Sequence, residues 1–250
     1  MARYVLIPKR FDLIVMDTRL IRIAILFPST GLIDGELCDM AEERGAQALI
    51  YKVSPLAIAD PASPSAVAAM VQEMGSPAML AHVARQTLDV APDVVVWACT
   101  SGSFLGGDAD KAAQAGAMSA AAGGIPATTT SLAILDTLLS RNIRHVAAVT
   151  PYHVDIGRKF VSFLADNGFI VDGEAHAGCG SDSEVGALTI SDLKPLVARA
   201  VTEKTEAVVI PCTALRHQTI EADLLKAFGI PAVLANAATL DYAIKLARMG

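Results

Sequence analysis

The stretch "PDVVVWACTSGSFLGG", residues 92–107, places a run of β-branched and aromatic residues directly before a cysteine and a cluster of hydroxyl side chains. A short apolar run bounded by turn residues is typical of a strand buried on both faces, as in a parallel sheet. The segment "TEAVVIPCTALRHQ", residues 205–218, repeats this pattern around a second cysteine. The repetition predicts two strands in equivalent positions, one ending at Cys99 and the other at Cys212.

A longer internal repeat surrounds the two cysteines. The first is followed by "GIPATTTSLAILDTL" and the second by "GIPAVLANAATLDYAI", with about 113 positions between the cysteines and about 105 between the Gly-Ile-Pro triplets. This spacing is too long for a solenoid and fits two duplicated subdomains. We therefore predict an α/β fold of two similar Rossmann-like lobes with parallel sheets, related by pseudo-twofold symmetry.

Apolar runs alternate with Ala-rich segments along the chain, as expected of parallel strands joined by right-handed helical crossovers. We expect residues 1–130 with residues 235–250 to form the first lobe, and residues 131–234 to form the second. The predicted strands cover residues 21–27, 94–99, 145–150 and 207–212, and the predicted helices cover residues 65–74, 77–88, 111–122, 131–141, 155–167 and 191–204.

The loops after the predicted strands are the candidate site. Ligands of open parallel sheets bind beyond the carboxyl ends of the strands. The four loops concerned, residues 28–31, 99–103, 151–153 and 212–214, should therefore meet in one cleft between the lobes. We expect the active site in this interlobe cleft.

The composition excludes several classes of partner. Hydrophobic residues make up 53% of the 250 residues, charged residues 18%, and the net charge is −6. This composition supports a substantial core, and the absence of a basic cluster argues against nucleic acid as a partner. Charges interrupt the apolar runs of residues 1–22, so we expect no signal peptide, no membrane partner and a cytoplasmic location with reduced thiols.

The sequence contains none of the common metal-binding or nucleotide-binding motifs. The five histidines lack metal-binding spacing, and the four cysteines include no CxxC pair. The segment "SGSFLGGDAD" fits neither the dinucleotide-binding GxGxxG pattern nor a P-loop. We therefore predict no metal and no cofactor. His153 and His217 fall near the predicted cleft, but their residue type favours a surface or helix-start role.

Cys99 and Cys212 are the candidate catalytic groups. A cysteine between a strand and a helix lies among free backbone N–H groups and at the positive end of the helix dipole, which favours the thiolate. The sequence thus predicts a pKa of Cys99 below the unperturbed value of about 8.5. A lone cysteine is more often a small buried hydrophobe, whereas two at equivalent strand ends favour function. Cys38, expected on an amphipathic helix, and Cys179, expected in a loop, lack this context.

Hydroxyl groups near the first cysteine and after the third strand can bind a carboxylate. Thr100, Ser101 and Ser103 carry hydroxyls, and Gly102 leaves neighbouring N–H groups accessible to an anion. Tyr152 directly follows the third strand and can donate to the same carboxylate, although its residue type is equally compatible with packing.

These segments resemble the aspartate/glutamate racemase superfamily, and within it the branch of maleate cis-trans isomerases and arylmalonate decarboxylases. The resemblance runs from Ile21 onward through "FPSTGL", "WACTSGSF", "GIPATTTSLAILDTL", "VTPYHVDIGRKFVSFL" and "VVIPCTAL". It implies an enzyme that needs no cofactor or metal and that places two thiols on either side of a carbanion-like or enediolate centre. It also implies a homodimer or a higher homo-oligomer.

The resemblance assigns roles position by position. Cys99 corresponds to the cysteine that attacks the double bond in the isomerases or acts as acid or base in the racemases, and Cys212 to its partner for proton transfer. The decarboxylases have a glycine in place of the first cysteine, so two thiols point away from decarboxylation. With the loop positions added, the candidate substrate-binding residues are Ser29, Thr30, Thr100, Ser101, Tyr152 and Thr213.

Two positions differ from the maleate isomerases. Those enzymes carry Ser-Asn in the first loop, where this chain has Ser29-Thr30-Gly31, and an asparagine near "GSDSEVG", where this chain has Asp182. In the maleate isomerases, the side-chain amides of these two asparagines bind a dicarboxylate. The differences argue against maleate itself and leave a related dicarboxylate or an amino-acid derivative open.

The leading hypothesis is a cofactor-independent cis-trans isomerase of a small unsaturated carboxylate or dicarboxylate, in which a thiolate adds to the double bond. The alternative is a two-base racemase or epimerase of an amino acid or a derivative, with one thiol on each face of the substrate. An arylmalonate-type decarboxylase and a non-enzymatic two-lobed binding protein are further alternatives. The binding protein gives no reason for duplicated cysteines.

Overall fold

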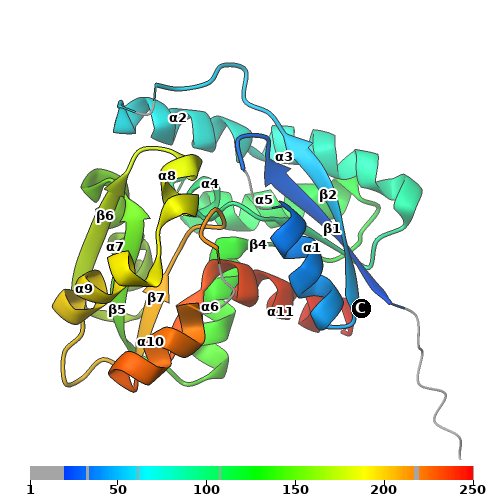
Figure 1. Cartoon of the computed structure of the whole chain (residues 1–250). Coiled ribbons are helices and arrows are strands. Elements are labelled where there is room, and N and C mark those ends of the chain that lie inside the picture. The colour runs from blue at the N-terminus through cyan, green and yellow to red at the C-terminus, as the bar shows by residue number, and fades with distance from the viewer. Residues whose placement is uncertain (1–19, 32–33, 61, 107, 217–219, 250) are drawn as a thin grey trace, which may run out of the picture.

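Two four-stranded parallel sheets form the framework of the protein (Figure 1). The computed structural model describes residues 20–31, 34–60, 62–106, 108–216 and 220–249. The strand order is β2-β1-β3-β4 in the first sheet and β6-β5-β7-β8 in the second. Each half of the chain therefore builds its sheet in the same order, which confirms the predicted α/β fold and extends the sequence repeat to the topology.

The inner strands are more completely buried than the edge strands β2 and β6. Every residue of "VVVW" in β3 and of "AVVI" in β7 is buried, as expected for strands covered on both faces. The edge strands β2 and β6 are largely half-exposed. The strands are β1 (Ile21–Pro28), β2 (Ala46–Val53), β3 (Val94–Trp97), β4 (Ala127–Thr129), β5 (His145–Tyr152), β6 (Ile170–Cys179), β7 (Ala207–Ile210) and β8 (Ala232–Leu234).

Helices connect the strands, and several begin at side-chain caps. Ser63 and Ser76 each accept a backbone N–H and are each followed by a proline in the first helical turn. The helices are α1 (Asp34–Glu43), α2 (Pro64–Met74), α3 (Pro77–Arg85), the 3₁₀ helix η1 (Gln86–Val90), α4 (Thr100–Phe104), α5 (Asp108–Ala121), α6 (Thr130–Ser140), α7 (Val154–Asp166), α8 (Asp182–Ala187), α9 (Ile190–Ala200), α10 (Ile220–Phe228) and α11 (Ala235–Ala247).

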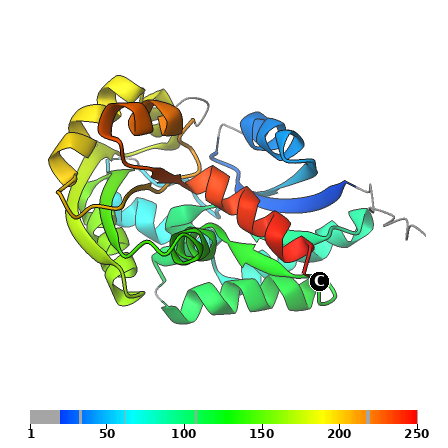
Figure 2. The same ribbon diagram turned by 90° about the horizontal axis from the view of Figure 1, so that it is seen from below.

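The last helix of each half packs against the sheet of the other half. Helix α6 follows the first sheet, but Ile134 and Leu138 pack in the core around the second sheet. Helix α11 follows the second sheet, but Leu240 and Ile244 pack in the core around the first sheet. Figure 2 shows α11 crossing from one half of the molecule to the other. This exchange supports the division at residues 130/131 and 234/235, which remains our prediction.

The sequence located the central strands of both sheets but none of the edge strands. All four predicted strands are present, although β3 and β7 end two residues before their cysteines. The expectation that Cys179 lies in a loop is wrong, because it is the last residue of β6 and pairs in register with Tyr152. No helix among the described residues is both long and apolar enough to cross a membrane.

Candidate active site

A cavity of about 760 Å³ lies at the carboxyl ends of the strands and is lined by both halves of the chain. Of the predicted site residues, Thr30, Cys99, Thr100, Ser101, Tyr152, Cys212 and Thr213 line it. Ser29 does not line it; its side chain is exposed, and its backbone N–H bonds to the Val53 carbonyl. His153 lies at the cavity with a half-exposed side chain. His217 lies outside the described residues.

Cys99 is held at the start of α4. Its backbone is extended, and its sulfur accepts the Gly102 N–H at 3.4 Å. The Ser101 hydroxyl lies 3.8 Å from the same sulfur. Gly102 allows a close approach here, because a Cβ at this position would lie 3.1 Å from the Cys99 sulfur. The sulfur therefore accepts one backbone N–H, lies beside one hydroxyl and has little free space around it.

Cys212 adopts a backbone conformation that is rare for a residue with a side chain. Its φ is +101°, in the region that glycine adopts readily and other residues adopt at a cost of about 1–3 kcal/mol. Such strain persists only where surrounding contacts hold it, and it is frequent at functional sites. The surrounding fold therefore holds the Cys212 backbone, and with it the thiol, in an unfavourable conformation.

Two threonine hydroxyls join the cysteine loops to each other. The Thr100 hydroxyl accepts the backbone N–H of Cys212 at 3.1 Å, and the Thr213 hydroxyl donates to the Ala98 carbonyl at 3.2 Å. All of these groups are buried. Each threonine thus reaches the backbone beside the other cysteine, which fixes the two thiols relative to each other. The Thr213 hydroxyl proton is used in the bond to Ala98, and the role of Thr213 in substrate binding remains a prediction.

One further side chain donates a hydrogen bond to a backbone carbonyl of each cysteine loop. The Ser131 hydroxyl donates to the Thr100 carbonyl, and the Asn236 amide donates to the Thr213 carbonyl. Ser131 is the second residue of α6, and Asn236 is the second residue of α11. Neither residue was predicted as part of the site, although both occupy matching places in the repeated Gly-Ile-Pro segments.

Tyr152 lies in the cavity with its hydroxyl unpaired. The residue is only 7% exposed, and the hydroxyl has no hydrogen-bond partner among the described residues. The ring packs near Phe104, with 6.2 Å between the ring centroids. Burial, followed by the neighbouring charges of Cys212 and Cys99, raises the pKa of Tyr152 well above its usual range. The phenol therefore lies near the Cys212 thiol and the Thr100 hydroxyl, which influence its pKa, but it makes no hydrogen bond of standard geometry with a described residue.

Both cleft thiols are neutral in the ligand-free protein, contrary to the expectation for Cys99. Burial raises the pKa of Cys99 to about 12, which outweighs the lowering effect of the Gly102 N–H. Burial also raises the pKa of Cys212, and the charge of Asp182 raises it further. The expectation fails because α4 has only five residues, so its dipole is too short to compensate for the loss of hydration.

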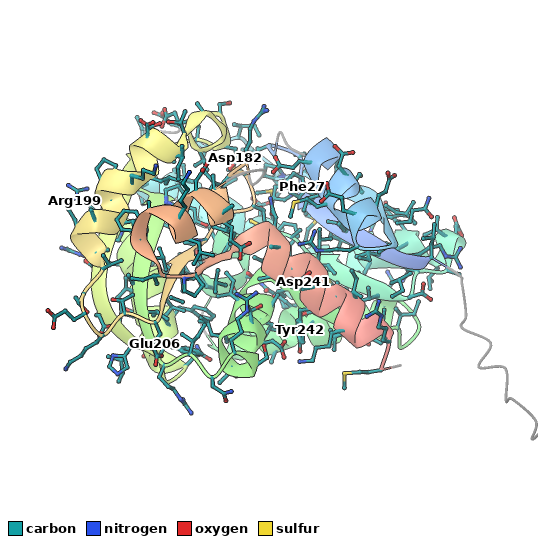
Figure 3. The ribbon with its side chains drawn as sticks, turned by 60° about the horizontal axis from the view of Figure 1, so that its bottom comes forward. Phe27, Asp182, Arg199, Glu206, Asp241 and Tyr242 are labelled. Carbon is teal, nitrogen blue, oxygen red and sulfur yellow. The ribbon has the colours of Figure 1, made fainter. Side chains whose placement is uncertain are left out.

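Asp182 is a charged group of the cavity that our candidate list omitted. It begins α8 after the cap Ser181, and its Oδ2 accepts the Thr30 hydroxyl at 3.0 Å. Burial raises the pKa of Asp182, while the Thr30 hydrogen bond lowers it. Figure 3 labels Asp182 in the second half and Phe27 on β1 in the first, and both line the cavity. Cys179 also lines the cavity. Its position is therefore compatible with a role in the site as well as with a structural role.

One wall of the cavity is apolar. Helix α2 contributes Val67, Met70, Val71 and Met74, and the preceding segment contributes Ile58. Among the described residues, no group of three or more His, Cys, Asp or Glu side chains could hold a metal ion. The cavity thus combines the thiols of Cys99, Cys179 and Cys212, several hydroxyls and one buried carboxylate with a hydrophobic side.

Two duplicated parallel sheets, each ending in a cysteine that faces a shared cavity, define a protein of the aspartate/glutamate racemase superfamily. Residues 65–250 match the family model described as "Arylmalonate decarboxylase", and the chain belongs to this arylmalonate decarboxylase and maleate isomerase family. Enzymes of both kinds are similar to it in sequence. The chain is 29% identical to arylmalonate decarboxylase of Bordetella bronchiseptica over 60% of its own length and 63% of the relative's.

A second relative is maleate isomerase of Nocardia farcinica, with 27% identity over 62% of this chain and 64% of the relative. The aligned regions therefore span less than two thirds of both curated relatives. Solved structures match more of the fold. Unliganded arylmalonate decarboxylase superposes with a TM-score of 0.74 at 25% identity, covering 92% of this chain and 94% of that one.

Two maleate isomerase structures share the same fold. The Nocardia farcinica enzyme, as a cysteine-to-serine mutant with a covalently bound succinylcysteine intermediate, has a TM-score of 0.78 at 20% identity and covers 91% of this chain and 93% of that chain. The enzyme of Pseudomonas putida S16 has a TM-score of 0.79 at 16% identity, with 91% and 92% coverage. At these identities the likeness concerns the fold alone.

Proposed function

We propose that the protein is a cofactor-independent cis-trans isomerase of a small unsaturated carboxylate, and that Cys99 and Cys212 are its catalytic residues. The observation that carries this proposal is the pair of buried thiols, which come from equivalent strand ends and line one cavity. Thr100 and Thr213 hold their loops together. A fixed pair of this kind can act on two neighbouring carbon atoms of one substrate.

In the proposed reaction the Cys99 sulfur forms a bond to one alkene carbon. The Cys99 proton passes to Cys212, and the original Cys212 proton passes to the second alkene carbon, so that a neutral thiol adds across the double bond. The resulting single bond rotates, and the reverse transfers release the trans product. Covalent addition removes the barrier of the double bond by dividing one difficult step into two.

The ligand-free protein contains groups suited to these steps. Both thiols are neutral, which is the state from which net addition starts and to which it returns. Tyr152 is an unpaired buried donor and Ser101 carries a hydroxyl at the cavity, so both can receive the substrate carboxylate. The succinylcysteine in the Nocardia farcinica isomerase supports covalent chemistry on a cysteine in that relative.

A two-base racemase or epimerase of an amino acid or a derivative is the second candidate. It is favoured by the equivalent placement of the two thiols at matching strand ends, because racemisation needs one acid and one base on opposite faces. Decarboxylation, known for one of the relatives, needs a single protonation step and gives no role to a second thiol. We further predict that the protein forms a homodimer or a higher homo-oligomer and that its substrate is a small carboxylate.

Mass spectrometry and isotope labelling distinguish the two candidates. We expect Cys212→Ser incubated with small cis-unsaturated carboxylates to form a covalent adduct on Cys99 slowly and to retain it, because the serine hydroxyl relays protons less readily than a thiol; the adduct is visible as protein plus substrate. Cys99→Ser should form no adduct and no product, because a serine hydroxyl without a neighbouring base is a weak nucleophile. Cys38→Ser serves as a control and should retain activity.

A racemase would instead incorporate deuterium from D₂O at the α-carbon of an amino-acid substrate, without any adduct. If Cys99→Ser remained active on a substrate of the wild-type enzyme, both candidates would be excluded.

A further inference from the structure

The charged groups of the cavity are unusual for a site that binds a carboxylate. The described lining residues include Asp182 and Glu184 but no lysine or arginine. The side chain of Lys52 lies nearby, where it contacts the Gly31 carbonyl at 3.5 Å and the Phe27 ring at 4.9 Å. A substrate with two carboxylates would therefore bring its second negative charge into a partly buried site whose described lining has no lysine or arginine.

Asp182 and Glu184 differ in what their oxygens do. The Glu184 carboxylate accepts the Gly180 N–H at 2.7 Å and so supports the start of α8. Asp182 uses Oδ2 for the Thr30 hydroxyl, and its Oδ1 has no hydrogen-bond partner among the described residues. Asp182 thus presents one free acceptor oxygen, held in position by a residue from the other half of the chain.

The cavity also contains the complementary donor. The Tyr152 hydroxyl is buried and has no acceptor among the described residues. Buried polar groups without partners are rare in folded proteins and are commonly satisfied by a ligand or by water. One carboxylate of a ligand would satisfy the tyrosine, whereas Asp182 requires a hydrogen-bond donor or a cation.

We propose that Asp182, positioned by Thr30, binds a nitrogen donor of the substrate, so that the substrate carries one carboxylate and one ammonium or carboxamide group in place of a second carboxylate. This inference rests on the proposed function in taking the cavity as the active site. It applies to both candidate reactions, because an unsaturated monoamide suits the isomerase and an amino acid suits the racemase. Figure 3 shows the position of Asp182 at the start of α8.

Binding of saturated ligands tests the proposal without catalysis. Succinate, succinamate and 4-aminobutanoate contain a four-carbon chain but neither a double bond nor an α-stereocentre, so neither proposed reaction can consume them. Isothermal calorimetry at pH 7.5 should show that at least one nitrogen-containing ligand binds the wild-type protein ten or more times more tightly than succinate does.

Asp182→Asn supplies the decisive comparison, because an amide has nearly the same shape and still accepts the Thr30 hydrogen bond. We expect this variant to lose most of the preference for the ammonium ligand and to bind succinate more tightly than the wild-type protein. Glu203→Gln is the matched control, since it removes one negative charge from an exposed loop position and should leave all three affinities unchanged.

The proposal is overturned if the wild-type protein binds succinate as tightly as the nitrogen ligands, if it binds none of the three, or if Asp182→Asn leaves the order of affinities unchanged. The proposed function has separate tests, adduct formation and deuterium incorporation. A protein with the expected ligand preference but without either chemistry would retain the inference about Asp182 and lose the proposed function.

Discussion

The reactivity of Cys99 toward a small disulfide tests the effect of burial on the cleft. At pH 8, a thiol with a pKa of about 12 is roughly one part in ten thousand thiolate, against about one part in four for an unperturbed thiol of pKa about 8.5. The reduced thiolate population alone would slow exchange by roughly 2,000-fold. The more basic thiolate is a better nucleophile, with a Brønsted coefficient of about 0.4–0.5.

This higher nucleophilicity recovers roughly 25- to 55-fold of the rate. The net expectation is that Cys99 in the folded protein reacts roughly 40- to 100-fold more slowly at pH 8 than the same cysteine in the unfolded chain. The reaction is slower in the folded protein because burial favours the neutral thiol, which does not attack disulfides. The rate should therefore keep rising, by about tenfold per pH unit, beyond the pKa of an ordinary thiol.

The assay is exchange with bis(2-hydroxyethyl) disulfide between pH 7 and pH 10.5, followed by acid quenching and peptide mass spectrometry. The unfolded chain in guanidinium provides the reference for each cysteine. Restricted access would lower the rate at every pH but would leave its plateau near pH 9, so the plateau separates access from ionisation. A plateau below pH 9.5, or faster exchange than in the unfolded chain at pH 8, would refute the reasoning.

Three further predictions concern stability. Thr213→Val should lower the free energy of unfolding by about 1–3 kcal/mol in urea titrations, because it leaves the buried Ala98 carbonyl without its donor. Thr213→Ser keeps the donating hydroxyl and should retain most of the wild-type stability, and equal effects of the two substitutions would contradict this. Asp182→Asn should raise the melting temperature at pH 7 by roughly 2–4 °C, since burial disfavours the charged carboxylate; a lower melting temperature would count against it. Gly75→Ala should sharply reduce soluble folded protein, because its Cβ would collide with the Gly102 carbonyl, whereas Gly116→Ala, with open space around it, should fold normally.

The sequence predicted the strands that are buried on both faces. Runs such as "VVVW" and "AVVI" have no polar interruption, and the structure places them inside the sheets. The edge strand β6, "IVDGEAHAGC", mixes polar and small residues because one side lacks a neighbouring strand. Its composition resembles that of a loop, which explains the misplacement of Cys179.

The composition of the site was easier to predict than its electrostatics. The repeat indicated both cysteines, and loop positions indicated most of the lining hydroxyls. The pKa of Cys99 could not be read from the sequence, because it depends on how completely the opposite half of the chain excludes water. Similarly, Asp182 lies in the sequence 152 positions from Thr30, and no local pattern links them.

The exchange of α6 and α11 between the two sheets has an evolutionary meaning. Two identical half-length chains that traded their last helices would form a domain-swapped dimer, a low-cost route to self-association. Neither half could cover its sheet without the other, so a dimer of this kind would be obligate, with two identical thiols related by its twofold axis. In a single chain that joins the two halves, the two thiol positions can differ. In the present chain Cys99 caps a helix from extended backbone, whereas Cys212 occupies a left-handed conformation, so two residues at equivalent places in the repeat differ in local structure.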